Sequence, residues 1–170
     1  MKNKKVLFLT QAAMIAAIYV VLTFIANAFG LANYAVQVRF SEALTILPYF
    51  TPAAIPGLFV GCLLSNILTG CALPDIIFGS IATLLGALGT YALRRWKWCA
   101  PICPIVSNMI IVPLVLIYGY GLLIEELSVL QCFGYYCLTV GAGELISCGI
   151  LGMILLFALQ KYSRKIFAAD

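Results

Sequence analysis

The feature that most constrains this chain is a series of apolar runs, each close to the length of a membrane-spanning helix. The first continues from Val6 to Phe29 without a charged residue. A bilayer core needs about 20 apolar residues in helical form, and these runs do not alternate as barrel strands do. Because lipid cannot hydrogen-bond to exposed backbone, a helical bundle fits best. We therefore expect an all-α integral membrane protein with one domain over residues 1–170.

The composition excludes a water-facing surface and a nucleic-acid partner. Only 9% of the residues are charged and 64% are hydrophobic, whereas soluble domains carry about a quarter charged residues. The net charge of +4 comes mainly from three short clusters: Lys2, Lys4 and Lys5; Arg94, Arg95 and Lys97; Lys161, Arg164 and Lys165. No basic face is interleaved with aromatic residues. By the positive-inside rule, the clusters predict cytoplasmic N- and C-termini.

Six spans follow from these clusters and runs. They are expected at Val6–Phe29, 41–50, 53–69, Pro74 to Arg94, Pro101 to about Leu123, and about Cys132 to Leu159. Residues 41–50 form an unusually short span, because ten α-helical residues rise about 15 Å against a core of about 30 Å. This span is therefore expected to be extended, tilted or continued past Pro48. Two re-entrant segments are the alternative.

The cysteines and the lack of histidine argue against a metal site and against catalysis. The seven cysteines are scattered, mostly inside apolar runs, where they act as small hydrophobic residues. Without histidine no Ser–His or metal–His site can form, and Asp75 and the terminal Asp170 cannot make an aspartate dyad. We predict that the protein is not an enzyme and has no catalytic residues and no metal ligands.

Four ionisable residues in or beside apolar runs mark the candidate site: Arg39, Glu42, Asp75 and Glu144. A charge at the bilayer centre costs about 2.5–3.5 kcal/mol on the insertion scale, so each should face the bundle interior or a wet cavity. Glu144 lies about 18 Å below the outer end of the last helix, near the midplane. Glu42 and Asp75 lie in first turns, where the helix dipole stabilises an acid without any ligand. Arg39 could pair with either.

Further polar and aromatic residues lie on the outer halves of the predicted helices: Asn27, Asn33, Asn66, Tyr118, Tyr120, Tyr135 and Tyr136. An acidic and aromatic pocket open to the outside would suit a small planar cation. Tyrosine is also enriched at membrane interfaces without any ligand. The residues predicted to bind the ligand are Glu144, Asp75, Glu42, Arg39, Asn33 and Tyr136.

The first predicted helix carries a stripe of small residues. Ala12, Ala13, Ala16 and Ala17 form two overlapping pairs, each spaced by four residues. Such pairs allow helix backbones to approach closely in lipid. The stripe therefore indicates either packing within the bundle or a surface on which a partner subunit docks.

The stretch VRFSEALTILPYFTPAAIPGLFVGCLLSNILTG, followed by LPDIIFGSIATLLGALGTYALRR, resembles the QueT family of queuosine-precursor transporters, most specifically over residues 36–95. These are S components, the substrate-binding membrane subunits of energy-coupling-factor (ECF) transporters. The resemblance implies a six-helix S-component bundle in the plasma membrane. It also implies a site under the loop between the first two helices, which captures a 7-deazaguanine precursor, the 7-aminomethyl form.

The resemblance further implies partners and residue roles. A transmembrane coupling subunit would dock on the alanine stripe, two ATP-binding subunits would hydrolyse ATP, and the bundle would topple to release the substrate inside. The chain has no GxxxxGK[ST] loop and needs no cofactor of its own. Glu144 would accept the N–H edge of the guanine-like ring, and Asp75 or Glu42 would face the ammonium. The alternatives are an S component for another vitamin or purine-like molecule, and a self-sufficient small-molecule transporter.

Overall fold

The computed structural model describes residues 4–30 and 38–167, without the side chains of residues 164 and 165. Across these ranges the chain is helical and contains no strand. The helices are α1 (Lys4–Ala28), η1 (Phe40–Tyr49), α2 (Ala54–Leu68), η2 (Asp75–Gly79), α3 (Ser80–Ala92), η3 (Lys97–Cys99), α4 (Ile102–Leu114), η4 (Val115–Gly119), α5 (Val129–Glu144), η5 (Leu145–Leu151), α6 (Gly152–Gln160) and α7 (Ser163–Ile166). The predicted all-α fold is confirmed.

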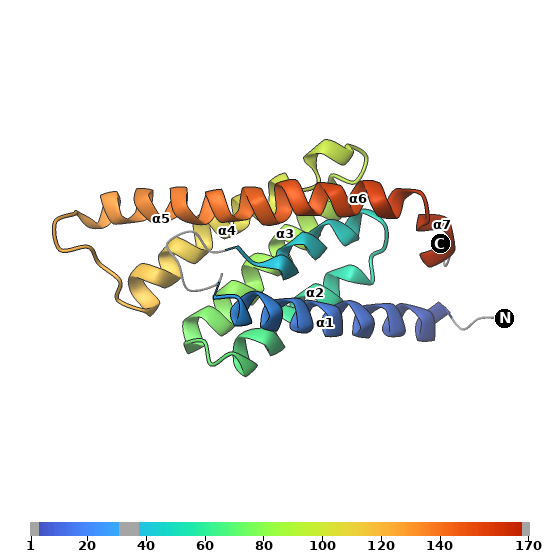
Figure 1. The fold of residues 1–170 in the computed structure, drawn as a ribbon, viewed down its shortest axis with the longest axis horizontal. Helices are drawn as coiled ribbons and strands as arrows, with labels where there is room; N and C mark the ends of the chain where they lie inside the picture. Colours follow the sequence, from blue (N-terminus) through green and yellow to red (C-terminus); the bar gives the residue numbers. More distant parts are fainter. Residues whose placement is uncertain (1–3, 31–37, 168–170) are drawn as a thin grey trace.

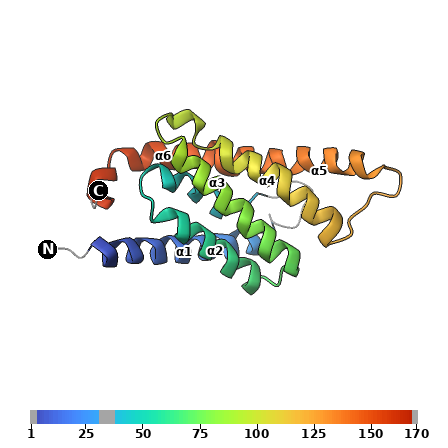
Figure 2. The same cartoon turned by 180° about the vertical axis from the view of Figure 1, so that it is seen from behind.

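The helices make six passes along the bundle, as predicted from the apolar runs. Four passes are long and apolar enough to cross a membrane: α1, η2–α3, η3–α4–η4 and α5–η5–α6. The shorter η1 and α2 supply the other two. Figures 1 and 2 show both termini at the same end of the bundle. The turn that carries Lys97 packs on α6, since the Lys97 ammonium lies 5.4 Å from the Phe157 ring centroid. The assignment of the end that holds the termini to the cytoplasm stays a prediction.

The short second pass is the centre of the bundle. η1 is a 3₁₀-helix, and eight consecutive residues in it, Ser41–Pro48, are buried. It packs against α1, α3, η5 and α6. A 3₁₀-helix rises about 2.0 Å per residue, so ten residues reach about 20 Å rather than 15 Å. Of the expectations that this span is extended, tilted or continued past Pro48, the 3₁₀ rise agrees with the first, because it makes the helix longer. Its buried residues contact other helices rather than lipid.

The alanine stripe of α1 divides between two faces. Ala12 and Ala16 are buried against α2, where Gly57 and Gly61 leave no room for a side chain. A Cβ at Gly61 would lie 3.1 Å from the Ala16 carbonyl oxygen. Ala13 and Ala17 are exposed. One pair therefore packs within the bundle, and the other lies on the outer surface of α1.

Three of the long passes contain a π-helical turn: η2 begins one, η4 ends another, and η5 lies within the last. Such turns change the direction of side chains and are frequent at functional sites. Asp75 begins η2, and Glu144 directly precedes η5. Pro113, which has no N–H to donate, lies just before η4. Two of the predicted site residues therefore lie where the regular helical pattern changes.

Candidate functional site

A cavity of about 360 Å³ lies between the ends of α1, α2 and η4, at the end of the bundle away from both termini. Its lining residues come from most of the passes: Thr23, Ala26, Asn27, Arg39, Asn66, Thr69, Gly70, Cys71, Asp75, Val112, Leu116, Tyr120 and Leu122. Small-molecule sites commonly occupy about 300–1,000 Å³. The cavity is therefore large enough for a small ring-shaped ligand.

Asp75 is the carboxylate of this cavity, and its side chain is held in place by neighbours. It is 8% exposed, and the Tyr120 hydroxyl donates to its Oδ2 at 3.3 Å. The Asn66 side-chain amide donates to the Asp75 backbone oxygen at 3.3 Å. Gly79 leaves the space that the carboxylate occupies, because a Cβ there would lie 2.9 Å from Oδ1.

Arg39 separates this cavity from a second, much smaller one. The small cavity has a volume of about 20 Å³, and Arg39 and Val112 line both. Its other lining residues are Gly79, Thr83, Asn108, Val140 and Glu144. This volume holds about one water molecule. The Arg39 side chain is therefore part of the wall between the Asp75 cavity and the Glu144 cavity.

Glu144 is 8% exposed, and each of its two carboxylate oxygens accepts a hydrogen bond. The Asn108 amide nitrogen donates to Oε1 at 3.0 Å. The Cys148 thiol, one helical turn further along, donates to Oε2 at 3.0 Å. Both donors are themselves buried. The carboxylate is thus oriented from two helices while it remains part of the small cavity.

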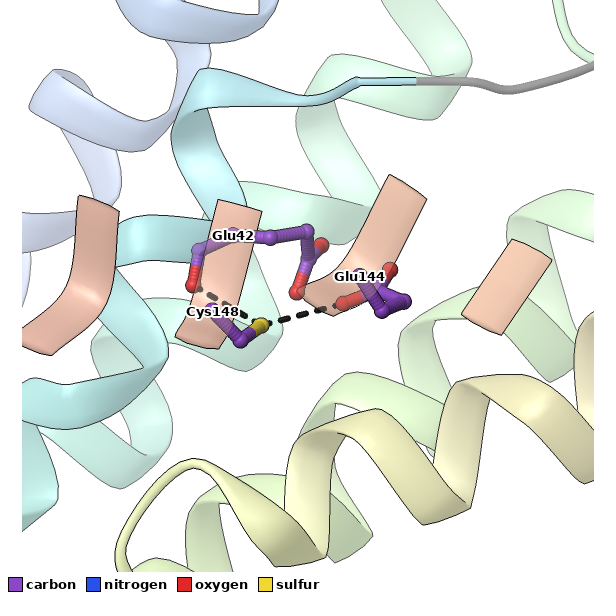
Figure 3. Close-up of side chains that lie close together, drawn as sticks. All are labelled: Glu42, Glu144 and Cys148. Carbon is purple, nitrogen blue, oxygen red and sulfur yellow. Dashed lines mark hydrogen bonds between the residues drawn. The ribbon is translucent and has the colours of Figure 1, made fainter. Parts of the chain in front are cut away.

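Glu42 lies next to Glu144 but lines neither cavity. It is 1% exposed, and the Tyr19 hydroxyl donates to its Oε1. Its other oxygen, Oε2, is the one buried side-chain oxygen or nitrogen in the described part of the chain that has no hydrogen-bond partner. Figure 3 shows Glu42 and Glu144 pointing toward one another beside Cys148. One oxygen of each acid and the Cys148 sulfur lie within 4.8 Å of one another.

The structure thus brings together the four charged residues that the sequence singled out. Arg39 and Asp75 line the large cavity, Arg39 and Glu144 line the small one, and Glu42 lies beside Glu144. Among the described residues, Arg39 forms no ion pair at 4.0 Å or less. Its backbone N–H donates to the Ser147 hydroxyl at 3.2 Å, which ties the start of η1 to η5.

The two remaining predicted ligand residues are not at these cavities. Asn33 lies outside the described residues. Tyr136 is half-buried, packs edge-on against Tyr135 with ring centroids 5.6 Å apart, and lines neither cavity. A role for either in ligand binding stays a prediction.

Several site residues were not among those predicted to bind the ligand. Asn66 and Tyr120 had been noted only as polar residues of the outer half, and Asn108 had no assigned role. Cys148 is buried, as expected of a small hydrophobic residue, and its thiol also donates to a carboxylate. Its spacing of four residues from Glu144 places both on one helix face, and this was the signal available in the sequence.

Comparison with known protein families matches residues 9–161 to the family described as QueT transporter. The chain belongs to the QueT transporter family. This QueT family chain is also 32% identical over 98 residues to the queuosine precursor transporter QueT of Lactococcus lactis subsp. cremoris (strain MG1363). That match covers 57% of this chain and 57% of the relative, so it spans little more than half of either protein. No solved structure was found to match.

Family membership agrees with the apolar passes. A QueT family chain with four long apolar helices and two shorter ones is a multi-pass membrane protein, as predicted from the composition. The resemblance over residues 36–95 is confirmed by a family match that extends across most of the chain.

Proposed function

We propose that this chain is the substrate-binding membrane subunit of an ECF-type ABC importer and captures a queuosine precursor, 7-aminomethyl-7-deazaguanine. Membership of the QueT family and the name of the Lactococcus relative support this substrate class. One observation carries the proposal: a buried acid lies in each of two adjoining cavities, Asp75 in the large one and Glu144 in the small one.

The chemistry of the ligand matches this pair of acids. An aminomethyl-deazaguanine offers a flat ring, an edge with neighbouring N–H donors and an ammonium group. A carboxylate that accepts two N–H bonds from one edge is a strong and specific recognition element. We assign the ring edge to Glu144 and the ammonium to Asp75. Because Arg39 lies between the two cavities, its side chain moves aside when one ligand reaches both acids.

The proposed partners are a transmembrane coupling subunit and two ATP-binding subunits. The exposed pair Ala13 and Ala17 offers the coupling subunit a surface that the bundle itself does not use. The basic end of the bundle faces the cytoplasm, the cavity end faces outside, and toppling of the bundle exposes the cavity to the cytoplasm. ATP is hydrolysed by the partners, since this chain has no phosphate-binding loop.

Ligand binding by the purified chain tests the substrate assignment. A panel of deazapurines, thiamine and riboflavin is titrated, and the aminomethyl-deazaguanine is expected to bind most tightly. Glu144→Gln should weaken that binding by tenfold or more, because losing a charge-assisted hydrogen bond costs about 1.5–3 kcal/mol. Glu126→Gln, on the exposed segment before α5, is the matched control and should leave Kd unchanged. If no deazapurine binds, the proposed substrate is wrong.

Uptake into liposomes tests the mechanism. The chain alone should bind the ligand without accumulating it, whereas reconstitution with a coupling subunit, two ATP-binding subunits and ATP should give uptake. Accumulation by the chain alone, driven by a proton gradient, would instead establish a self-sufficient transporter.

A further inference from the structure

Glu42 is a buried acid that the proposed ligand contacts do not use. We propose that Glu42 carries a proton, and that as a neutral carboxylic acid it positions Glu144 as the ionised acceptor for the ligand. The part that concerns the ligand rests on the proposed function. The location of the proton does not depend on the proposed function, and it can be measured without any ligand.

The two carboxyl groups are too close to be ionised together in this environment. They come from η1 and from the end of α5, and one oxygen of each lies within 4.8 Å of the other (Figure 3). Both residues are buried in the interior of a membrane protein. Two acids that share such a site repel one another when both are charged, and one of them keeps its proton. The pair therefore holds one proton.

The hydrogen-bond donors around the pair decide which acid holds it. An ionised carboxylate needs donors at both oxygens, whereas a protonated one uses one oxygen to donate. Glu144 receives the Asn108 amide on Oε1 and the Cys148 thiol on Oε2. Glu42 receives the Tyr19 hydroxyl on Oε1, and its Oε2 has no partner in the described part of the chain. The geometry therefore assigns the proton to Oε2 of Glu42.

Among the described residues, five other charged or titratable groups lie around the pair. They are Tyr19 on α1, Arg39 before η1, Cys62 on α2, Asp75 on η2 and Cys148 on η5. With Glu42 neutral, the site holds two negative charges, on Glu144 and Asp75, and one positive charge, on Arg39. The site then has one unbalanced negative charge, which a ligand with one ammonium group neutralises.

Glutamine is an isostere of the protonated acid, so the proposal predicts opposite outcomes at the two positions. Glu42→Gln keeps a neutral group that can donate toward Glu144, so it should weaken binding of the aminomethyl-deazaguanine far less than Glu42→Leu, which cannot donate. Glu144→Gln removes the acceptor and should weaken binding by at least tenfold. A loss at Glu42→Gln as large as that at Glu144→Gln would overturn the positioning role.

Infrared spectroscopy of the ligand-free protein at neutral pH locates the proton directly. The wild type should show the C=O stretch of a buried carboxylic acid, which is lost in Glu42→Gln and retained in Asp75→Asn. Tyr19→Phe gives a second way to assign the C=O band to Glu42, without replacing Glu42 itself. It removes the donor to the C=O oxygen, so the band should move to higher frequency. No acid band in the wild type, or a band that survives Glu42→Gln, would overturn the proposal.

A metal ion at the same cluster is the competing occupant, because two carboxylates and a thiol can bind one. Metal analysis of the purified protein should find no stoichiometric metal. A stoichiometric metal that disappears in Cys148→Ala would replace the proton and overturn the proposal. If the infrared result holds while Glu144→Gln leaves Kd unchanged, the proton stays assigned to Glu42, and the ring-edge role of Glu144 in the proposed function fails.

Discussion

Gly57 of α2 packs directly on the backbone of Ala12 of α1: a Cβ atom at Gly57 would lie only 2.7 Å from the Ala12 carbonyl oxygen. The next turn repeats the contact between Gly61 and Ala16. In lipid, helices gain little from meeting through large apolar side chains, and close backbone contact supplies much of their association. This seam therefore fixes how α1 lies against the rest of the bundle.

Gly57→Ala should destabilise the protein by about 1–3 kcal/mol, because the added methyl group overfills a packed contact with rigid backbone. Gly134→Ala is the matched control, since Gly134 lies in α5 with no atom within 4 Å of its added Cβ. It should stabilise the helix by about 0.5–1 kcal/mol. Thermal unfolding in one detergent measures both, and a Gly57→Ala protein as stable as the wild type would contradict the contact.

Ala17→Trp should separate ligand binding from partner binding. Ala17 is exposed, so the larger side chain leaves the bundle and the cavity intact, but it fills the surface proposed for the coupling subunit. Co-purification with that subunit should fall at least tenfold, with Kd for the ligand unchanged. Leu138→Trp, on the exposed face of α5, should change neither quantity. Normal association of Ala17→Trp would place the docking surface elsewhere.

Tyr120→Phe tests the orientation of Asp75. The substitution removes the donor to Oδ2 and the acceptor of the Ala72 N–H, which lies 3.1 Å from the Tyr120 hydroxyl. A hydrogen bond of this kind contributes about 1 kcal/mol, so ligand affinity should fall about fivefold. Tyr118→Phe is the control, because Tyr118 is exposed and lines neither the Asp75 cavity nor the Glu144 cavity. Equal affinities for the two variants would show that Tyr120 does not position Asp75.

Cysteine labelling tests which end of the bundle faces outside. Cys71 lines the large cavity, and Cys99 follows Trp98, whose ring packs on Phe157 of α6. In variants that retain only one of them, a membrane-impermeant maleimide should label Cys71 in intact cells and Cys99 only after permeabilisation. The ligand should also slow the labelling of Cys71. The reverse pattern would invert the predicted topology.

Much of the fold could be predicted because charge and hydropathy act directly on a membrane chain. The basic clusters and apolar runs located all six passes, and the Arg94–Arg95 pair correctly marked the end of α3. The enclosure of η1 could not be predicted, since an apolar segment has the same composition whether it faces lipid or other helices. Its 3₁₀ winding follows from tertiary packing that local propensity does not express.

The sequence could predict which charged residues lie near the site, but only part of how they are arranged. The cost of burying a charge pointed to Arg39, Asp75 and Glu144, and all three line cavities. The same argument placed Glu42 in the bundle interior or at a cavity, and the structure has it in the interior, where it lines neither cavity. Burial cost shows that an acid needs a partner, but it does not show whether that partner is a ligand or another side chain. Only the contacts with Tyr19 and Glu144 distinguish the two.

The location of η1 affects how this binding site can evolve. Arg39 directly precedes this helix and Glu42 lies within it, next to the site, while Ser41–Pro48 fill the centre of the bundle. A substitution there disturbs several helices together, so any new specificity at the base comes with a loss of stability. The rim is built from helix ends and turns, such as those at Gly70 and Tyr120. Directed evolution toward other ring-shaped ligands should therefore yield viable variants at the rim far more often than along η1.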